Sequence, residues 1–225
     1  MPEIATLIPA GDIELAADIS IPDRASSVVV FAHGSGSSRH SPRNLQVAGA
    51  LHRGGIGSIL VDLLTEEEEA IDIETAELRF DIPRLGRRLG AITGWILTQP
   101  AFKKMKLGYF GASTGAAAAF VAAADRPRAV RAVVSRGGRP DLAGAALQRV
   151  EAPTLFIVGG NDPVVLDLNY WALARLPHQT AHKLEIIPGA GHLFEEPGAL
   201  DKVAALARDW FRAHLGSAST RLNSR

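Results

Sequence analysis

The stretch from residue 107 to residue 124 constrains the fold of this chain more than any other. It reads LGYFGASTGAAAAFVAAA, so that an apolar run leads into a turn of small residues and then into an alanine-rich run. No turn residue follows until Asp125-Arg126-Pro127. A continuous apolar run is typical of an element that is buried on both sides. The stretch therefore predicts a buried strand, a sharp turn and a buried helix.

The turn in this stretch has the pattern Gly-x-Ser-x-Gly, with Ser113 at its centre. Small residues around a serine permit a strained corner between a strand and a helix, from which the hydroxyl group projects above the sheet as a nucleophile. The same pentapeptide also arises by chance, and a tight turn that simply needs small residues is the alternative interpretation. The surrounding elements have to decide between the two.

Short apolar runs elsewhere predict further strands of a parallel sheet. Together with the run at 107–110, they lie at 28–32, 56–61, 130–134, 154–158 and 184–187. The segment 13–21, in which apolar and polar residues alternate, instead predicts a strand with one wet face, and 4–8 is expected to pair with it as a hairpin. We expect this antiparallel hairpin at one edge of the sheet.

Helical patterns lie between these strands, at 41–53, 81–97 and 199–215, and a further helix is expected to start near Pro163. Gly86 and Gly90 are expected to let the helix at 81–97 lie close to the sheet. Strands that alternate with helices indicate right-handed crossovers. The predicted fold class is therefore α/β, with a doubly wound, mostly parallel sheet.

The length of 225 residues is that of one domain, which we expect over residues 1–215. Residues 216–225 have no periodicity and predict a flexible C-terminal tail. The interval between residues 135 and 154 leaves room for about one helix, so no large cap domain is expected, and any cover would come from residues 64–79. Within these, the run TEEEE at 65–69 predicts a solvated loop or helix start, with a substrate-facing role as the alternative.

Composition excludes several classes of protein. The 24 basic residues balance the 24 acidic ones, and no basic stripe suits a nucleic acid. The absence of cysteine excludes disulfides, thiolate metal sites and a cysteine nucleophile. No histidines and carboxylates have metal-ligand spacing, so neither a metal nor a cofactor is expected. With no targeting segment and no run long enough to cross a bilayer, we expect a cytoplasmic protein without a membrane partner, as a monomer or homodimer.

Four candidate site features follow predicted strands, where open α/β sheets bind their ligands. They are the loop His33-Gly34-Ser35-Gly36-Ser37-Ser38, the turn at Ser113, Gly159-Gly160-Asn161-Asp162 and Gly189-Ala190-Gly191-His192. A serine needs an imidazole to take its proton, and the imidazole needs a carboxylate to fix its tautomer. The sequence therefore predicts a catalytic triad of Ser113, Asp162 and His192.

Each of these residues has a plainer interpretation. Asp162 could simply cap the helix that starts near Pro163, with Asp141 and Asp167 as poorer candidates for the acid. His192 could be a buried structural histidine, although it lies in a glycine-flanked loop. His33 is expected to shape its loop rather than to act as a base.

The glycine-rich loop at residues 33–38 can turn backbone N–H groups inward. We expect an oxyanion hole formed by the N–H groups of Ser35 and Thr114. Phosphate binding is the alternative, but the loop lacks both the Lys-Ser/Thr ending of a P-loop and the third glycine of a dinucleotide fingerprint. Gly34, Gly36 and Arg136 are candidates for substrate binding, and a structural role for Arg136 is equally open.

The motifs resemble those of the α/β-hydrolase family from residue 28 to residue 211. HGSGSS, DLLT at 62–65, GASTG, SRGGRPDLAG at 135–144 and GGNDPVVLDLN at 159–169 resemble the dienelactone-hydrolase-like branch, especially small hydrolases found alone or fused to phosphoribosyltransferases. The resemblance implies a lightly covered hydrolase for small to medium esters. Dienelactone hydrolases proper carry cysteine where this chain has Ser113, which favours a general serine esterase.

We therefore expect a serine hydrolase that cleaves a small-molecule ester through an acyl-enzyme intermediate. One alternative is a non-catalytic relative that binds a small ligand or a protein. Others use the same triad for dienelactone or thioester hydrolysis, acyl transfer, perhydrolysis or C–C bond cleavage.

Overall fold

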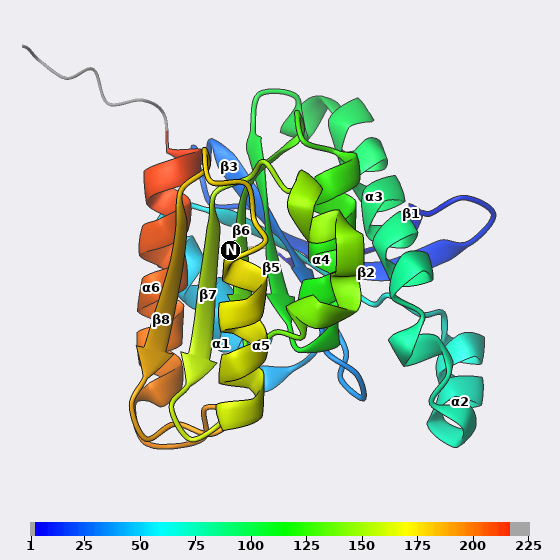
Figure 1. Ribbon diagram of the computed structural model, residues 1–225. Helices are drawn as coiled ribbons and strands as arrows, with labels where there is room; N and C mark the ends of the chain where they lie inside the picture. The colour runs from blue at the N-terminus through cyan, green and yellow to red at the C-terminus, as the bar shows by residue number, and fades with distance from the viewer. Residues whose placement is uncertain (1–2, 217–225) are drawn as a thin grey trace, which may run out of the picture.

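The structure, a computed structural model, describes residues 3–216 and is built on one eight-stranded sheet (Figure 1). The strand order is β1-β2-β4-β3-β5-β6-β7-β8. β1 pairs antiparallel with β2, β2 pairs antiparallel with β4, and all other pairs are parallel. The strands are β1 (Glu3–Pro9), β2 (Glu14–Ser20), β3 (Ser27–Ala32), β4 (Gly57–Val61), β5 (Lys106–Ala112), β6 (Val130–Arg136), β7 (Thr154–Gly159) and β8 (His182–Ile187). This arrangement confirms the predicted fold class.

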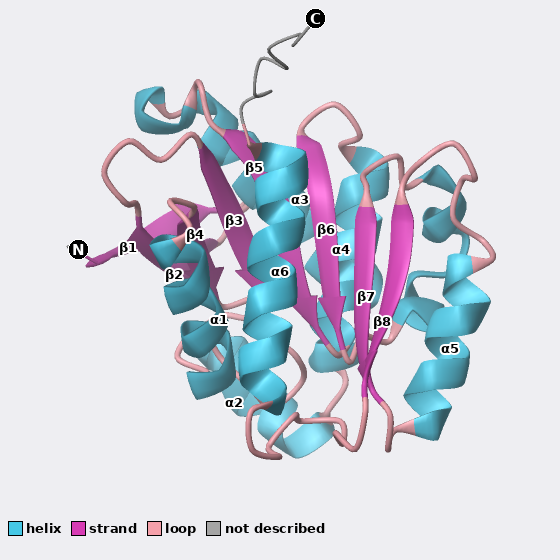
Figure 2. Ribbon diagram, turned by 90° about the vertical axis from the view of Figure 1, so that its left-hand side faces the viewer, coloured by secondary structure: helices cyan, strands magenta, loops and turns pink. Residues whose placement is uncertain are grey.

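The helices form two layers, one on each face of the sheet (Figure 2). α1 (Pro42–Arg53) and α6 (Ala199–Leu215) pack together on one face. α3 (Ile82–Thr98), α4 (Thr114–Asp125) and α5 (Pro163–Leu173) cover the other, and the short α2 (Glu66–Thr75) protrudes beyond them (Figure 1). Because both faces are covered, β3 and β7 are buried along their whole length, which explains their continuous apolar sequences.

Each layer encloses its own apolar core. On the α3–α4 face, the rings of Phe120 and Phe156 lie 5.6 Å apart, and on the α1–α6 face those of Phe31 and Phe110 lie 4.9 Å apart. Gly86 allows a close approach, but to α4 rather than to the sheet: a β-carbon at Gly86 would lie 2.5 Å from Cγ1 of Val121. The expectation for this glycine was therefore wrong about the partner, because α3 packs mainly against α4.

The side of β2 that was predicted to face solvent is buried in the second half of the strand. Asp18 and Ser20 lie on the polar side of the alternating pattern, yet both are buried. The segment before α1 covers this side, and Arg39 Nε donates to Asp18 Oδ2 over 3.1 Å. The alternation predicted the strand correctly but not the loop that packs over it.

The connecting segments also differ in detail from the sequence analysis. The interval between β6 and β7 holds η3 (Pro140–Arg149), two 3-10 segments joined at Gly144, where φ is +55°. The TEEEE run starts α2, with Thr65 and Glu68 forming a capping box. The remaining short helices are η1 (Leu78–Phe80) and η2 (Pro100–Phe102). Of the predicted tail, Gly216 ends α6 and residues 217–225 lie outside the described part.

Between residues 3 and 216, no helix has both the length and the apolar character that a bilayer crossing requires.

Candidate active site

Ser113 occupies a strained corner between β5 and α4. Its φ of +50° and ψ of −121° lie outside the regions that residues with side chains normally adopt. The flanking glycines make the corner possible, because a β-carbon at Gly111 would lie 2.4 Å from Cα of Ala116. One at Gly115 would lie 2.3 Å from the carbonyl oxygens of Ala32 and His33. The pattern Gly-x-Ser-x-Gly is thus required by the packing around the turn.

The loop after β6 holds this corner in place. The Ser113 N–H donates to the carbonyl oxygen of Arg136 over 3.2 Å, and the Ser113 carbonyl accepts from the Arg139 N–H over 3.1 Å. Strain in the backbone of Ser113 is therefore balanced by bonds on both of its peptide groups.

Asp162 and His192 come from the loops after β7 and β8, which are joined to each other. The Asn161 N–H donates to the carbonyl oxygen of Ala190 over 2.9 Å. A β-carbon at Gly159 would lie 2.4 Å from the same oxygen, so only glycine lets the loops approach this closely. Asp162 Oδ2 lies 2.6 Å from His192 Nδ1. Asp162 stands at the N-cap position of α5, but its side chain caps no N–H and bonds to the imidazole instead.

His192 and Ser113 meet at the same short loop. A β-carbon at Gly137 would lie 3.5 Å from His192 Cε1, and the preceding residue, Arg136, accepts the Ser113 N–H. The Asp162 bond holds Nδ1 and leaves Nε2 as the nitrogen that can accept a proton. The hydrogen bonds of the described residues do not include one between Ser113 and His192, and such bonds commonly tighten only around a bound substrate.

The glycine-rich loop after β3 lies against the serine. A β-carbon at Gly34 would be 3.0 Å from Cβ of Ser113. The Ser35 N–H donates to Thr114 Oγ1 over 2.9 Å, whereas the Thr114 N–H, the first of α4, has no acceptor among residues 3–216. The structure thus brings the two predicted oxyanion donors together, and one of them is engaged with the hydroxyl group of the other residue.

His33 shapes this loop, in line with its expected role. The Leu63 N–H donates to His33 Nε2 over 3.2 Å, and His33 Nδ1 lies 2.9 Å from the carbonyl oxygen of Gly34. These bonds correspond to the tautomer that is protonated on Nδ1. They tie the loop to the end of β4, where Asp62 in turn accepts from the N–H of Arg39 over 2.6 Å.

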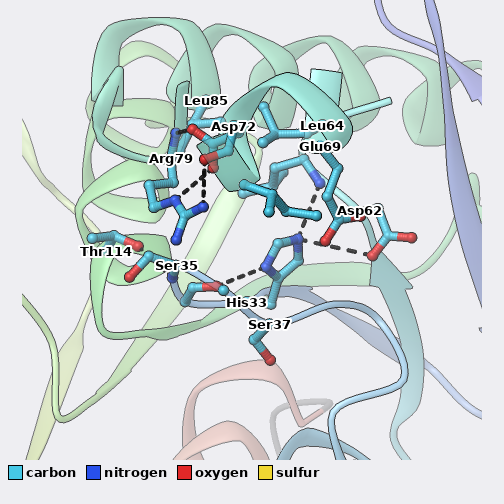
Figure 3. Close-up of a pocket in the computed structure, with 14 residues that line it drawn as sticks. His33, Ser35, Ser37, Asp62, Leu64, Glu69, Asp72, Arg79, Leu85 and Thr114 are labelled. Carbon is cyan, nitrogen blue, oxygen red and sulfur yellow. Dashed lines mark hydrogen bonds and ion pairs between the residues drawn. The ribbon is translucent and has the colours of Figure 1, made fainter. Parts of the chain in front are cut away.

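A cavity of about 350 Å³ opens beside this loop (Figure 3). It lies between the loop after β3 on one side and the segment 64–80 on the other, so that α2 and η1 form its cover. Its lining combines apolar and charged side chains. The lining residues are His33, Gly34, Ser35, Gly36, Ser37, Asp62, Leu63, Leu64, Glu69, Asp72, Ile73, Arg79, Leu85 and Thr114.

Two partly buried ion pairs anchor this cover. Arg79 Nε donates to Asp72 Oδ2 over 2.6 Å (Figure 3), and Arg88 makes two bonds of 2.6 Å with the carboxylate of Glu68. The hydrogen bond from Arg88 lowers the pKa of Glu68. Glu68 belongs to the TEEEE run that was predicted to be solvated, and the roles of Asp72, Arg79 and Arg88 were not predicted, because an ion pair of this kind has no local pattern that separates it from solvated charges.

Arg136 does not line this cavity. Its side chain lies on the α1–α6 face of the sheet, the face to which Val134, two residues earlier, also points. Gly34 and Gly36 do line the cavity, and their role in substrate binding stays a prediction. Within the described range, no three histidine or acidic side chains are grouped so that they could hold a metal ion.

The strand order, with a strained serine corner directly after β5 and the hydrogen-bonded Asp162 and His192 after β7 and β8, places this chain among the α/β-hydrolases. A family model described as "Dienelactone hydrolase family" matches residues 15–215. The crystal structure of a dienelactone hydrolase from Anabaena variabilis is 55% identical, with a TM-score of 0.92, and the match covers 95% of this chain and 98% of that one. This chain belongs to the dienelactone hydrolase family.

Other relatives agree in fold or in sequence. Two proteins of Mycobacterium tuberculosis named "Putative phosphoribosyl transferase" are 55% identical over 206 residues, which are 92% of this chain but only 45% of their own length. The structure of Est1E from Butyrivibrio proteoclasticus has a TM-score of 0.76 at 14% identity, covering 93% of this chain and 98% of that one. At that identity, the likeness concerns the fold alone.

Proposed function

We propose that this protein is a serine hydrolase that cleaves small to medium carboxylic esters. The observation that carries the proposal is the 2.6 Å bond between Asp162 and His192. This pair lies at the loop after β6, which also makes the hydrogen bonds that hold the strained Ser113. An imidazole oriented by a carboxylate beside a serine at a helix N-terminus is the arrangement that nucleophilic acyl transfer requires.

In the first step, Ser113 Oγ attacks the ester carbonyl while His192 Nε2 takes the hydroxyl proton. The tetrahedral oxyanion binds the free N–H of Thr114 and the N–H of Ser35, where it replaces the hydroxyl group of Thr114 as the acceptor. Collapse breaks the bond to the alcohol, which leaves with the proton from His192. Water then gives a proton to His192, attacks the acyl-enzyme, and releases the acid and Ser113.

The cavity supports a modest substrate. About 350 Å³ lies at the lower end of the range for small-molecule sites. Its apolar side chains suit an acyl or alcohol group of a few carbon atoms. Hydrolysis is favoured over phosphoribosyl transfer because the chain spans only 45% of the mycobacterial proteins with that name, but 98% of the dienelactone hydrolase structure.

The test is labelling with a fluorophosphonate probe, followed by intact mass spectrometry, together with turnover of short p-nitrophenyl esters. We expect stoichiometric labelling of the wild type and none of Ser113→Ala, with turnover reduced about 10⁴-fold or more. Ser37→Ala, a serine-to-alanine change in the cavity lining, is the matched control and should keep both. Labelling or turnover that survives in Ser113→Ala contradicts the proposal.

A further inference from the structure

Arg136 is a buried cation without a counterion. Only 7% of the residue is exposed, and its Nε and Nη1 atoms are buried without a hydrogen-bond partner. The other buried charged side chains of the described residues, Asp18, Asp72 and Arg88, each have a partner of opposite charge. An unpaired buried charge is costly, so it needs compensation that the chain itself does not give.

The charged group that influences Arg136 is a second cation, Arg43. Burial, and after it the charge of Arg43, lowers the pKa of Arg136 to about 10, so the Arg136 guanidinium group is still charged at neutral pH. Arg43 belongs to the first turn of α1, on the same face of the sheet. Because the charge of Arg43 disfavours the charged form of Arg136, the two arginines repel each other, which adds to the cost of burying Arg136.

The N-terminus of α1 adds a third positive element. Ser41 stands at the N-cap, but its side chain caps no N–H, and the first turn contains no acidic residue. Arg43 Nε is buried without a partner in this turn, and so is Asn44 Oδ1, an acceptor that would not itself bond to an anion. The free N–H groups of a first turn carry partial positive charge and are a common binding place for anions.

We propose that a small oxyanion binds where the end of β6 faces the first turn of α1, held by the guanidinium groups of Arg136 and Arg43. The ligand chemistry is that shared by phosphate and carboxylate groups, which accept bidentate bonds from arginine. The site lies on the α1–α6 face, apart from the cavity beside Ser35, and is independent of the proposed ester hydrolysis.

Glu195 is the rival explanation. Its Oε1 lies 3.8 Å from Arg43 Nη1, and its side chain is 71% exposed. If Glu195 were the counterion of this pair of arginines, an added anion would have no place to bind. Glu195→Gln therefore separates the two explanations.

The experiment is thermal unfolding and titration calorimetry of the full chain with sodium phosphate or sodium acetate, at ionic strength matched with sodium chloride. We expect saturable binding and a rise in Tm of about 5 °C or more at 100 times Kd. Arg136→Met should abolish both, and Arg43→Met should weaken binding at least tenfold. Arg149→Met is the control, because it removes an equal charge from an exposed side chain that bonds to Asp125, and it should keep the response.

Binding of phosphate alone supports a phosphate site, and binding of both anions supports a general oxyanion site. Retention of the response in Glu195→Gln also supports the proposal. Three results overturn the proposal. The first is a wild type whose Tm rises no more with phosphate or acetate than with chloride, and the second is an equal rise in Arg136→Met and Arg149→Met. The third is a loss of Tm in Glu195→Gln together with no response of the wild type to either anion. Arg43→Met keeps the test open if Arg136→Met does not fold.

Discussion

Replacing Asp162 with asparagine tests the pairing on which the proposed chemistry depends. Asp162 Oδ2 accepts a bond of 2.6 Å from His192 Nδ1, and only 15% of its side chain is exposed. An asparagine side chain has nearly the same shape but can turn its NH₂ group toward Nδ1. The imidazole then carries its proton on Nε2 and cannot accept one from Ser113.

The size of the effect follows from that change of tautomer. A carboxylate-to-amide change at this position of a triad lowers kcat about 10⁴-fold. At 1.36 kcal/mol for each factor of ten, this is a barrier increase of about 5 kcal/mol. KM should change little, because Asp162 does not line the cavity beside Ser35.

The assay is steady-state hydrolysis of p-nitrophenyl acetate, with circular dichroism to show that the variant is folded. Asp141→Asn and Asp167→Asn are matched controls. Both carboxylate oxygens of Asp141 accept from Arg139, over 2.9 and 2.7 Å, and Asp167 is exposed, so both variants should keep near wild-type kcat. A folded Asp162→Asn enzyme with more than a tenth of wild-type kcat would refute the reasoning, as would an equal loss in either control.

Two further predictions concern stability. Gly115→Ala forces a β-carbon to within 2.3 Å of two backbone oxygens and should lower the free energy of unfolding in urea by about 3 kcal/mol or more. Gly90→Ala, within α3, places a β-carbon at an ordinary contact distance of 3.8 Å from Arg126 Nε and should raise the free energy of unfolding by up to about 1 kcal/mol. Equal effects of the two substitutions would contradict the packing argument. Glu68→Gln should lower the free energy of unfolding at pH 7 by about 1–2 kcal/mol. Because the folded-state pKa of Glu68 lies below its ordinary value of 4.5, the stability that its ionised form contributes is present above pH 4.5 and is lost as the pH falls further. Urea unfolding of the wild type and of Glu68→Gln should therefore show a smaller difference in the free energy of unfolding at about pH 3.5 than at pH 7. A difference that stays constant would argue against the ion pair with Arg88.

The sequence predicted the sheet well, because burial on both faces leaves a strong trace. Strands such as β3 and β7 are short and wholly apolar, and the glycines around Ser113 mark a corner that few other residues fit. The order of Ser113, Asp162 and His192 along the chain could be read because each follows a strand.

What could not be predicted depends on which segments pack together. The alternation in β2 indicated a face exposed to solvent, but Arg39 covers Asp18 from a loop 21 residues away in the sequence. Arg136 was a candidate for substrate binding, yet the face to which its side chain points depends on the register of β6 within the sheet. The bond between the Ser35 N–H and Thr114 Oγ1 joins two loops, and no local pattern encodes it.

The ion pairs of Glu68 and Asp72 hold the cover formed by α2 and η1 in place. This cover is not part of the sheet whose strands lead to Ser113, Asp162 and His192. The residues of the proposed reaction and those that cover the cavity are therefore encoded in separate stretches of the gene. We expect a library confined to residues 69–80 that spares Asp72 and Arg79 to reshape the cavity while Ser113, Asp162 and His192 keep their supports. For the proposed hydrolase, we expect that new specificities can be reached by exchanging this short segment rather than by rebuilding the catalytic centre.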